Sequence, residues 1–92
     1  MRRVHVVVSG RVQGVAYRYS AQSAARRHQI TGWVRNLRDG SVEAEIQGSK
    51  EAVEAMLDWL HEGPPPARVS HIQATDRPAS PDETGFRILT GW

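Results

Sequence analysis

Apolar and polar residues alternate along residues 30–37 and 41–47 of this chain, the period that places every second side chain on one face of a β-strand. In residues 41–47, Val42, Ala44 and Ile46 are expected to face the core, and Glu43, Glu45 and Gln47 to face solvent. Residues 4–9 are a short β-branched run that also predicts a strand. The predicted strands span residues 4–9, 30–37, 41–47, 69–75 and 85–89. An Asp39-Gly40 pair between the second and third strands predicts a tight hairpin turn.

Two other segments repeat their small or apolar residues with helical spacing. Residues 18–28 form the first predicted helix, with Ala21, Ala24, Ala25 and His28 on one face. Ser49 is expected to cap a second helix that runs to about Glu62, because serine is a favourable residue at that position. The apolar stripe of this second helix consists of Val53, Met56, Leu57 and Leu60.

The element order is β-α-β-β-α-β with a final edge strand. This order predicts an α+β fold, the ferredoxin-like split βαβ sandwich, with two helices on one face of an antiparallel sheet of four to five strands. Residues 1–92 are expected to form a single domain, because no linker or repeat interrupts them. Many activities occur on this architecture, so function has to be inferred from a site.

Charge is distributed unevenly along the chain. Residues 1–38 contain eight arginines and no acidic residue, whereas residues 39–92 contain all ten acids and four basic residues, so the two portions carry +8 and −6. Guanidinium groups bind phosphate oxygens at two points, which indicates an anionic partner. Five of the arginines are expected to be solvated and to contribute only their field: Arg2, Arg3, Arg26, Arg27 and Arg38.

Composition excludes several kinds of chemistry and favours one cellular location. The chain has no cysteine, which excludes disulfides and thiol catalysis, and its four histidines have no metal-ligand spacing. We therefore expect no metal and no cofactor. No secretory signal or membrane span is recognisable, which favours the cytoplasm.

The stretch Gly10-Arg11-Val12-Gln13-Gly14-Val15-Ala16-Tyr17-Arg18 connects the first strand to the first helix. A glycine-containing loop at this place can turn several backbone N–H groups inward, and the start of the helix adds further donors. Arg18 lies at the junction, where its guanidinium can join them. The segment therefore predicts a phosphate-binding loop without lysine or metal.

This stretch, followed by Gly32-Trp33-Val34-Arg35-Asn36 and by Asp39-Gly40-x-Val42-Glu43, resembles the acylphosphatase family in motif content and spacing along the whole chain. The resemblance implies hydrolysis of the carboxyl–phosphate bond of acyl phosphates by in-line attack of water. Arg18 would bind the phosphate and Asn36 would position the attacking water. The loop expected to hold the phosphate oxygens consists of Val12, Gln13, Gly14, Val15, Ala16 and Tyr17.

The sequence departs from the family pattern at three places. Tyr17 replaces the usual phenylalanine, which could bring a hydroxyl near the loop. Gln29 stands where a helix-ending glycine is common, so a less regular helix end is expected. Thr90-Gly91-Trp92 runs past the family's usual end.

Two alternatives from other functional classes stay open at this point. The topology also occurs in RNA-binding modules, although the predicted strands lack interleaved aromatics and Glu43 and Glu45 would repel phosphates. A phosphate-sensing domain would bind phosphate without turnover. We expect a monomer that acts on a small acyl phosphate, with inorganic phosphate as product and inhibitor, and that binds neither nucleic acid nor membrane.

Overall fold

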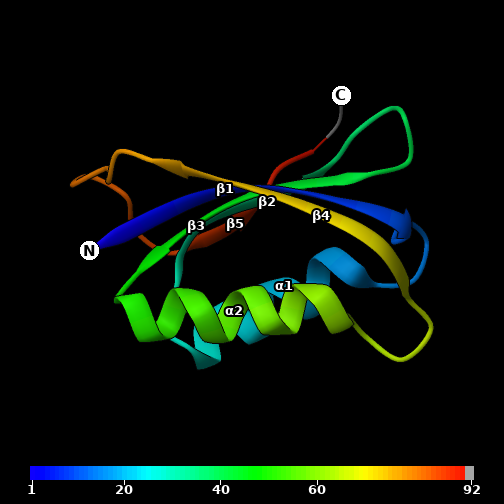
Figure 1. Ribbon diagram of the computed structural model, residues 1–92, viewed down its shortest axis with the longest axis horizontal. Coiled ribbons are helices and arrows are strands. Elements are labelled where there is room, and N and C mark those ends of the chain that lie inside the picture. The colour runs from blue at the N-terminus through cyan, green and yellow to red at the C-terminus, as the bar shows by residue number, and fades with distance from the viewer. Residues whose placement is uncertain (91–92) are drawn as a thin grey trace.

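The computed structural model describes residues 1–90; Gly91 and Trp92, and with them most of the predicted C-terminal extension, lie outside the described residues. A five-stranded sheet forms one layer and two helices cover one of its faces (Figure 1). The strands are β1 (Arg2–Arg11), β2 (Thr31–Asn36), β3 (Val42–Gly48), β4 (Arg68–Arg77) and β5 (Phe86–Ile88). The helices are α1 (Tyr17–Arg27) and α2 (Lys50–Glu62). The predicted fold class is thus confirmed.

The strands lie in the order β4-β1-β3-β2-β5, and one strand corrects the prediction of an antiparallel sheet. β1 pairs antiparallel with β3 and β4, and β2 pairs antiparallel with β3. The short β5, however, runs parallel to β2, with Phe86 opposite Gly32. The chain enters β5 after a loop that crosses from the far edge strand β4, and this route sets its direction. The sheet is therefore mixed.

The core lies between the sheet and the helices, as the alternation predicts. Val42, Ala44 and Ile46 of β3 are buried, and the valines of β1 that face the helices are buried with them. Val53, Met56 and Leu60 of α2 close the core from the other side. No helix among residues 1–90 is long and apolar enough to cross a membrane.

The C-terminal end of α1 differs from its predicted irregular form. His28 N–H donates to Ala24 O and Ile30 N–H donates to Ala25 O, which gives the helix a regular hydrogen-bonded end. Gln29 adopts a φ of 58°, the left-handed conformation that glycine favours at this place. The expectation of a less regular helix end is therefore wrong, because Gln29 adopts the backbone conformation that glycine commonly supplies there.

The face of the sheet away from the helices carries ion pairs. Arg3, predicted to be solvated, is instead buried, because its guanidinium pairs with Glu45 at 2.6 Å and with Glu83 at 2.9 Å. Glu43 pairs with both His5 and Arg35. The Arg3–Glu83 pair fixes the loop before β5 against the sheet, and the other pairs engage the carboxylates of Glu43 and Glu45.

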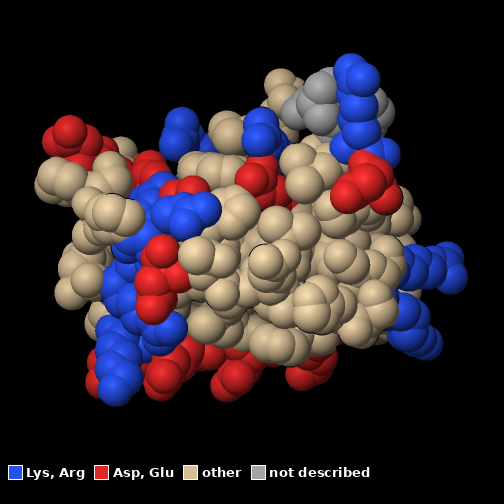
Figure 2. All heavy atoms as spheres, turned by 45° about the horizontal axis from the view of Figure 1, so that its top comes forward, with Lys and Arg blue, Asp and Glu red and all other residues tan. Residues whose placement is uncertain are grey.

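Exposed charges are segregated over the surface. The outer side of α2 is acidic, with Glu51, Glu54, Asp58 and Glu62 all exposed, and acidic atoms line the helix side of the molecule in Figure 2. At the end where β1 stops and β4 starts, Arg11 and Arg68 are exposed register partners. The phosphate-binding loop predicted above leaves β1 at this basic end.

Candidate active site

The segment between β1 and α1 begins near Gly10, a position in the sheet that only glycine can occupy. The register of β1 and β4 shifts between Ser9 and Gly10, and Gly10 has a φ of 123°. A Cβ on Gly10 would lie 2.1 Å from the Arg68 carbonyl oxygen, so no side chain fits there. This irregularity bends the chain out of β1 and into the loop.

The loop then ends in a helix start that has free backbone donors. Ala16, the residue before the first turn of α1, adopts a left-handed φ of 61° and offers no side-chain cap. The first turn of α1 also contains no acidic residue. Its N–H groups and the positive end of the helix dipole are therefore available to an anion.

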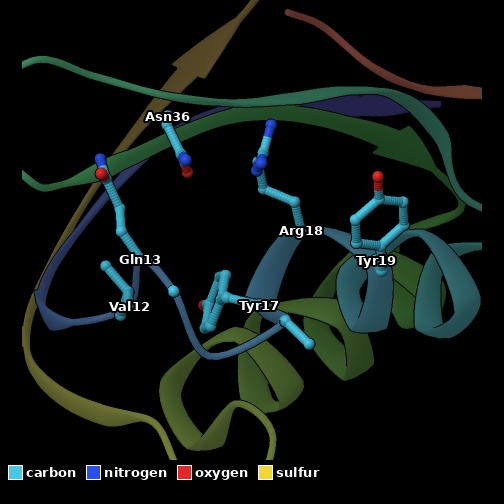
Figure 3. Close-up of a pocket in the computed structure, with 8 residues that line it drawn as sticks. Val12, Gln13, Tyr17, Arg18, Tyr19 and Asn36 are labelled. Atoms are coloured by element: carbon cyan, nitrogen blue, oxygen red, sulfur yellow. The ribbon is translucent and has the colours of Figure 1, made fainter.

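A pocket of about 200 Å³ opens over this loop (Figure 3). Its lining residues are Val12, Gln13, Gly14, Ala16, Tyr17, Arg18, Tyr19 and Asn36. Figure 3 shows Arg18 from α1 and Asn36 from β2 extending toward the same open space. Among residues 1–90, no acidic side chain is paired with Arg18, so its charge is available to a ligand.

Asn36 carries an unusual polar atom. It is the last residue of β2 and pairs with Val42 across the hairpin. Its Oδ1 is buried and is the one buried side-chain polar atom within residues 1–90 that has no hydrogen-bond partner. Buried acceptors nearly always have a donor, so this exception needs an explanation. An acceptor beside an open pocket is suited to a water or a ligand.

Gln13 connects the loop to the turn that follows Asn36. Its Nε2 donates to Leu37 O at 2.7 Å and to Ser41 O at 2.9 Å. The turn is itself ordered, because Asp39 Oδ1 accepts from the Ser41 N–H and hydroxyl, which also lowers the Asp39 pKa. One side chain thus joins the two segments that form the pocket.

The Tyr17 hydroxyl points away from the loop, contrary to the suggestion drawn from the sequence. It donates to Leu60 O at 2.6 Å, and the ring lies against Trp59 with centroids 5.5 Å apart. The α1–α2 packing decides this direction, because the ring enters the core beneath the loop. Burial raises the pKa of Tyr17 well above its ordinary value of 10.0.

Replacing Tyr17 with phenylalanine should therefore lower the stability and change its alkaline dependence. The lost hydrogen bond should cost about 1 kcal/mol near pH 7. In the wild type, the unfolded chain loses the phenolic proton first, so stability is full below pH 10.0 and falls as pH rises above it. Urea unfolding at pH 7, 10 and 11 should show a steeper alkaline loss for the wild type. Equal losses in both proteins would contradict the buried phenol.

The structure brings most of the predicted site residues together. All of them line the pocket except Val15, whose side chain is buried in the core. Tyr19 also lines the pocket and is 66% exposed, although the motif did not single it out. The signal that could have identified Tyr19 as a pocket residue is a large aromatic side chain directly after Arg18 in the first turn of the helix. Within residues 1–90, no three histidine or acidic side chains gather as a metal site would require.

Known proteins are similar to this chain in sequence and in structure. The acylphosphatase family model matches residues 4–88. An acylphosphatase from Geobacillus thermodenitrificans is 50% identical over 91 residues, which cover 99% of this chain and 97% of the relative. One from Natronomonas pharaonis is 54% identical over 87 residues, covering 94% and 92%.

Solved structures agree with these relatives. The crystal structure of acylphosphatase from Bacillus subtilis has a TM-score of 0.94 and 32% identity, covering 98% of this chain and 100% of that one. An acylphosphatase from Coxiella burnetii has a TM-score of 0.91 and 40% identity, with 96% and 92% covered. By sequence over nearly its whole length and by structure, this chain belongs to the acylphosphatase family.

Proposed function

We propose that this acylphosphatase holds the phosphoryl group of its substrate with Arg18 and the backbone amides of residues 12–17, while Asn36 orients the attacking water. The single observation that carries the proposal is the unpartnered Oδ1 of Asn36, which borders the same pocket as the unpaired Arg18 guanidinium. A water that donates to Oδ1 would acquire a defined direction of attack on a phosphorus held by the loop.

The chemistry of acyl phosphates explains why so few groups suffice. The bond that breaks joins the phosphorus to a carboxylate oxygen, and a carboxylic acid has a pKa of about 4.3, so the leaving group needs no proton. Asn36 and Arg18 cannot act as bases near neutral pH, and the Tyr17 hydroxyl is engaged with Leu60 O. The water oxygen bonds to phosphorus, and its proton passes to a phosphate oxygen.

Charge stabilisation supplies the remaining catalysis. Transfer of a phosphoryl group passes through a loose transition state, so positioning and electrostatics dominate. The Arg18 guanidinium and the free N–H groups at the start of α1 would hold the nonbridging oxygens and stabilise their negative charge. Exposed Arg11 and Arg68 at the same end of the sheet add a field that attracts an anionic substrate.

The face of the sheet away from the helices is poorly suited to binding RNA, which favours this proposal. Glu43 and Glu45 lie on that face in pairs with Arg35 and Arg3, so arginines that could contact phosphates are already engaged. The Arg35 guanidinium also lies 5.5 Å from the Trp33 ring centre, where a base would have to stack. The Arg18 guanidinium and the Asn36 Oδ1, which have no protein partner among residues 1–90, both lie at the pocket. A small acyl phosphate bound there fits this arrangement better than RNA on the sheet.

The test is hydrolysis of benzoyl phosphate by the purified chain. We expect turnover that is unchanged by EDTA and competitively inhibited by inorganic phosphate. The rate should show no dependence on an enzymatic base that titrates near neutral pH. Phosphate binding without turnover would favour a sensing domain instead, and salt-dependent RNA binding without turnover would favour a nucleic-acid module.

We further propose that residues 1–92 form one domain that acts as a cytoplasmic monomer.

A further inference from the structure

We infer that Gln13 is a positioning residue: its carboxamide fixes the phosphate-binding loop relative to Asn36 and thereby sets the alignment of water and phosphorus. This inference rests on the proposed roles of Arg18, the loop and Asn36. It adds a residue whose side chain acts on the geometry between the two halves of the site rather than on the substrate.

The contacts of Gln13 bridge segments that are distant in sequence. Its two acceptors, Leu37 O and Ser41 O, lie 24 and 28 residues further along the chain. Leu37 directly follows Asn36, and Ser41 directly precedes Val42, the register partner of Asn36. The Nε2 atom therefore reaches both sides of the hairpin turn, one residue beyond the last residue of β2 and one residue before the first residue of β3.

The hairpin can keep its own form without Gln13. Leu37 N–H donates to Ser41 O at 2.9 Å, and Gly40 N–H donates to Leu37 O at 3.2 Å. Both acceptors of Gln13 thus retain a backbone donor if the side chain is removed. The removal breaks the connection between the hairpin and the phosphate-binding loop. The distance between Asn36 and the loop is then no longer fixed by this side chain.

In-line attack is sensitive to this separation. A displacement of about 1 Å in a reacting group can lower the rate about 10²-fold. The main chain of Gln13 is part of the predicted phosphate-binding loop, whereas its side chain contacts the residue that follows Asn36. Binding of the phosphate requires only the loop and Arg18, whereas attack also requires the hairpin at the correct distance.

The first experiment replaces Gln13 with methionine, which has a similar length but no donor. We expect kcat for benzoyl phosphate to fall about 10- to 100-fold, while the inhibition constant of inorganic phosphate changes less than about threefold. Gln22→Met is the matched control, because Gln22 Nε2 also donates to a distant backbone carbonyl, Phe86 O at 2.9 Å, away from the pocket. It should keep the wild-type kcat.

A double-mutant cycle with Asn36→Ala separates positioning from general support of the fold. If Gln13 acts through Asn36, adding Gln13→Met to Asn36→Ala should lower kcat by less than about twofold further. Losses that multiply, a retained kcat in Gln13→Met, or a phosphate constant that weakens in step with kcat would each overturn the inference.

Circular dichroism establishes that each variant is folded at the assay temperature. If Gln13→Met is unfolded, Gln13→Asn takes its place under the same criteria, because its shorter side chain cannot reach both carbonyls. If both variants are unfolded, Gln13 serves folding and the inference is wrong. A wild-type chain without hydrolysis would refute the proposed function itself, which is a different result from an active wild type with an active Gln13→Met.

Discussion

Replacing Arg18 with glutamine should lower kcat/KM for benzoyl phosphate by about 10³-fold or more. The guanidinium lines the pocket without an acidic partner within residues 1–90, so its charge and its forked donors are available to the phosphoryl oxygens. Because it would bind the phosphate in the ground state and in the transition state, both substrate binding and turnover should suffer. Steady-state kinetics and inhibition by inorganic phosphate measure the two effects separately.

The matched control for Arg18 is Arg27→Gln, at the opposite end of the same helix. Arg27 is exposed, and its replacement removes the same charge from the chain. It should change kcat/KM less than about threefold, because charges separated by more than the screening length of about 10 Å interact weakly. An Arg18→Gln enzyme within tenfold of the wild type would contradict the assignment of the guanidinium to the phosphate.

Asn36→Ala should lower kcat about 10²- to 10³-fold and leave the inhibition constant of inorganic phosphate nearly unchanged. The substitution removes the acceptor that would orient water but leaves Arg18 and the loop in place. It also removes a buried oxygen that has no partner, so the free energy of unfolding should not fall.

Two measurements distinguish this outcome from damage to the fold. Urea unfolding should show an Asn36→Ala protein at least as stable as the wild type, and phosphate should still raise its stability. A variant that turns over benzoyl phosphate at near the wild-type rate would show that Asn36 does not direct the water. Loss of phosphate binding together with turnover would show that it belongs to the cradle instead.

The sequence was sufficient to predict the helices and strands and to predict that Arg18 and Asn36 lie at one pocket. The strand alternation of residues 41–47 and the stripe on α2 each predict which side chains are buried, and the structure agrees except at two positions. Gln47 was expected to face solvent but is buried beneath the loop before β5, where it bonds to Ser80, and Leu57 is only partly buried. Two motifs at a fixed spacing predicted that Arg18 and Asn36 share one site, and both side chains line the pocket. Both kinds of inference depend on neighbours in the chain, which the sequence shows directly.

The features that the sequence did not predict depend on tertiary packing. β5 is only three residues long, and its parallel direction follows from the route of the loop before it. Packing between the helices turns the Tyr17 hydroxyl toward Leu60, and the approach of the loop to the hairpin gives Gln13 its two carbonyl partners. Such partners, tens of residues apart, have no local signature.

The place of β1 between β3 and β4 has a consequence for how the chain folds. Of the five strands it is synthesised first, yet its register partners lie 34 to 46 residues later in β3 and 57 to 74 residues later in β4, so it cannot pair on both sides until β4 has been made. Chains dominated by such remote pairings fold in milliseconds to seconds, more slowly than helical bundles of equal size. Catalytic competence should therefore arise only late in folding, when the strand that leads into the phosphate-binding loop has found both partners.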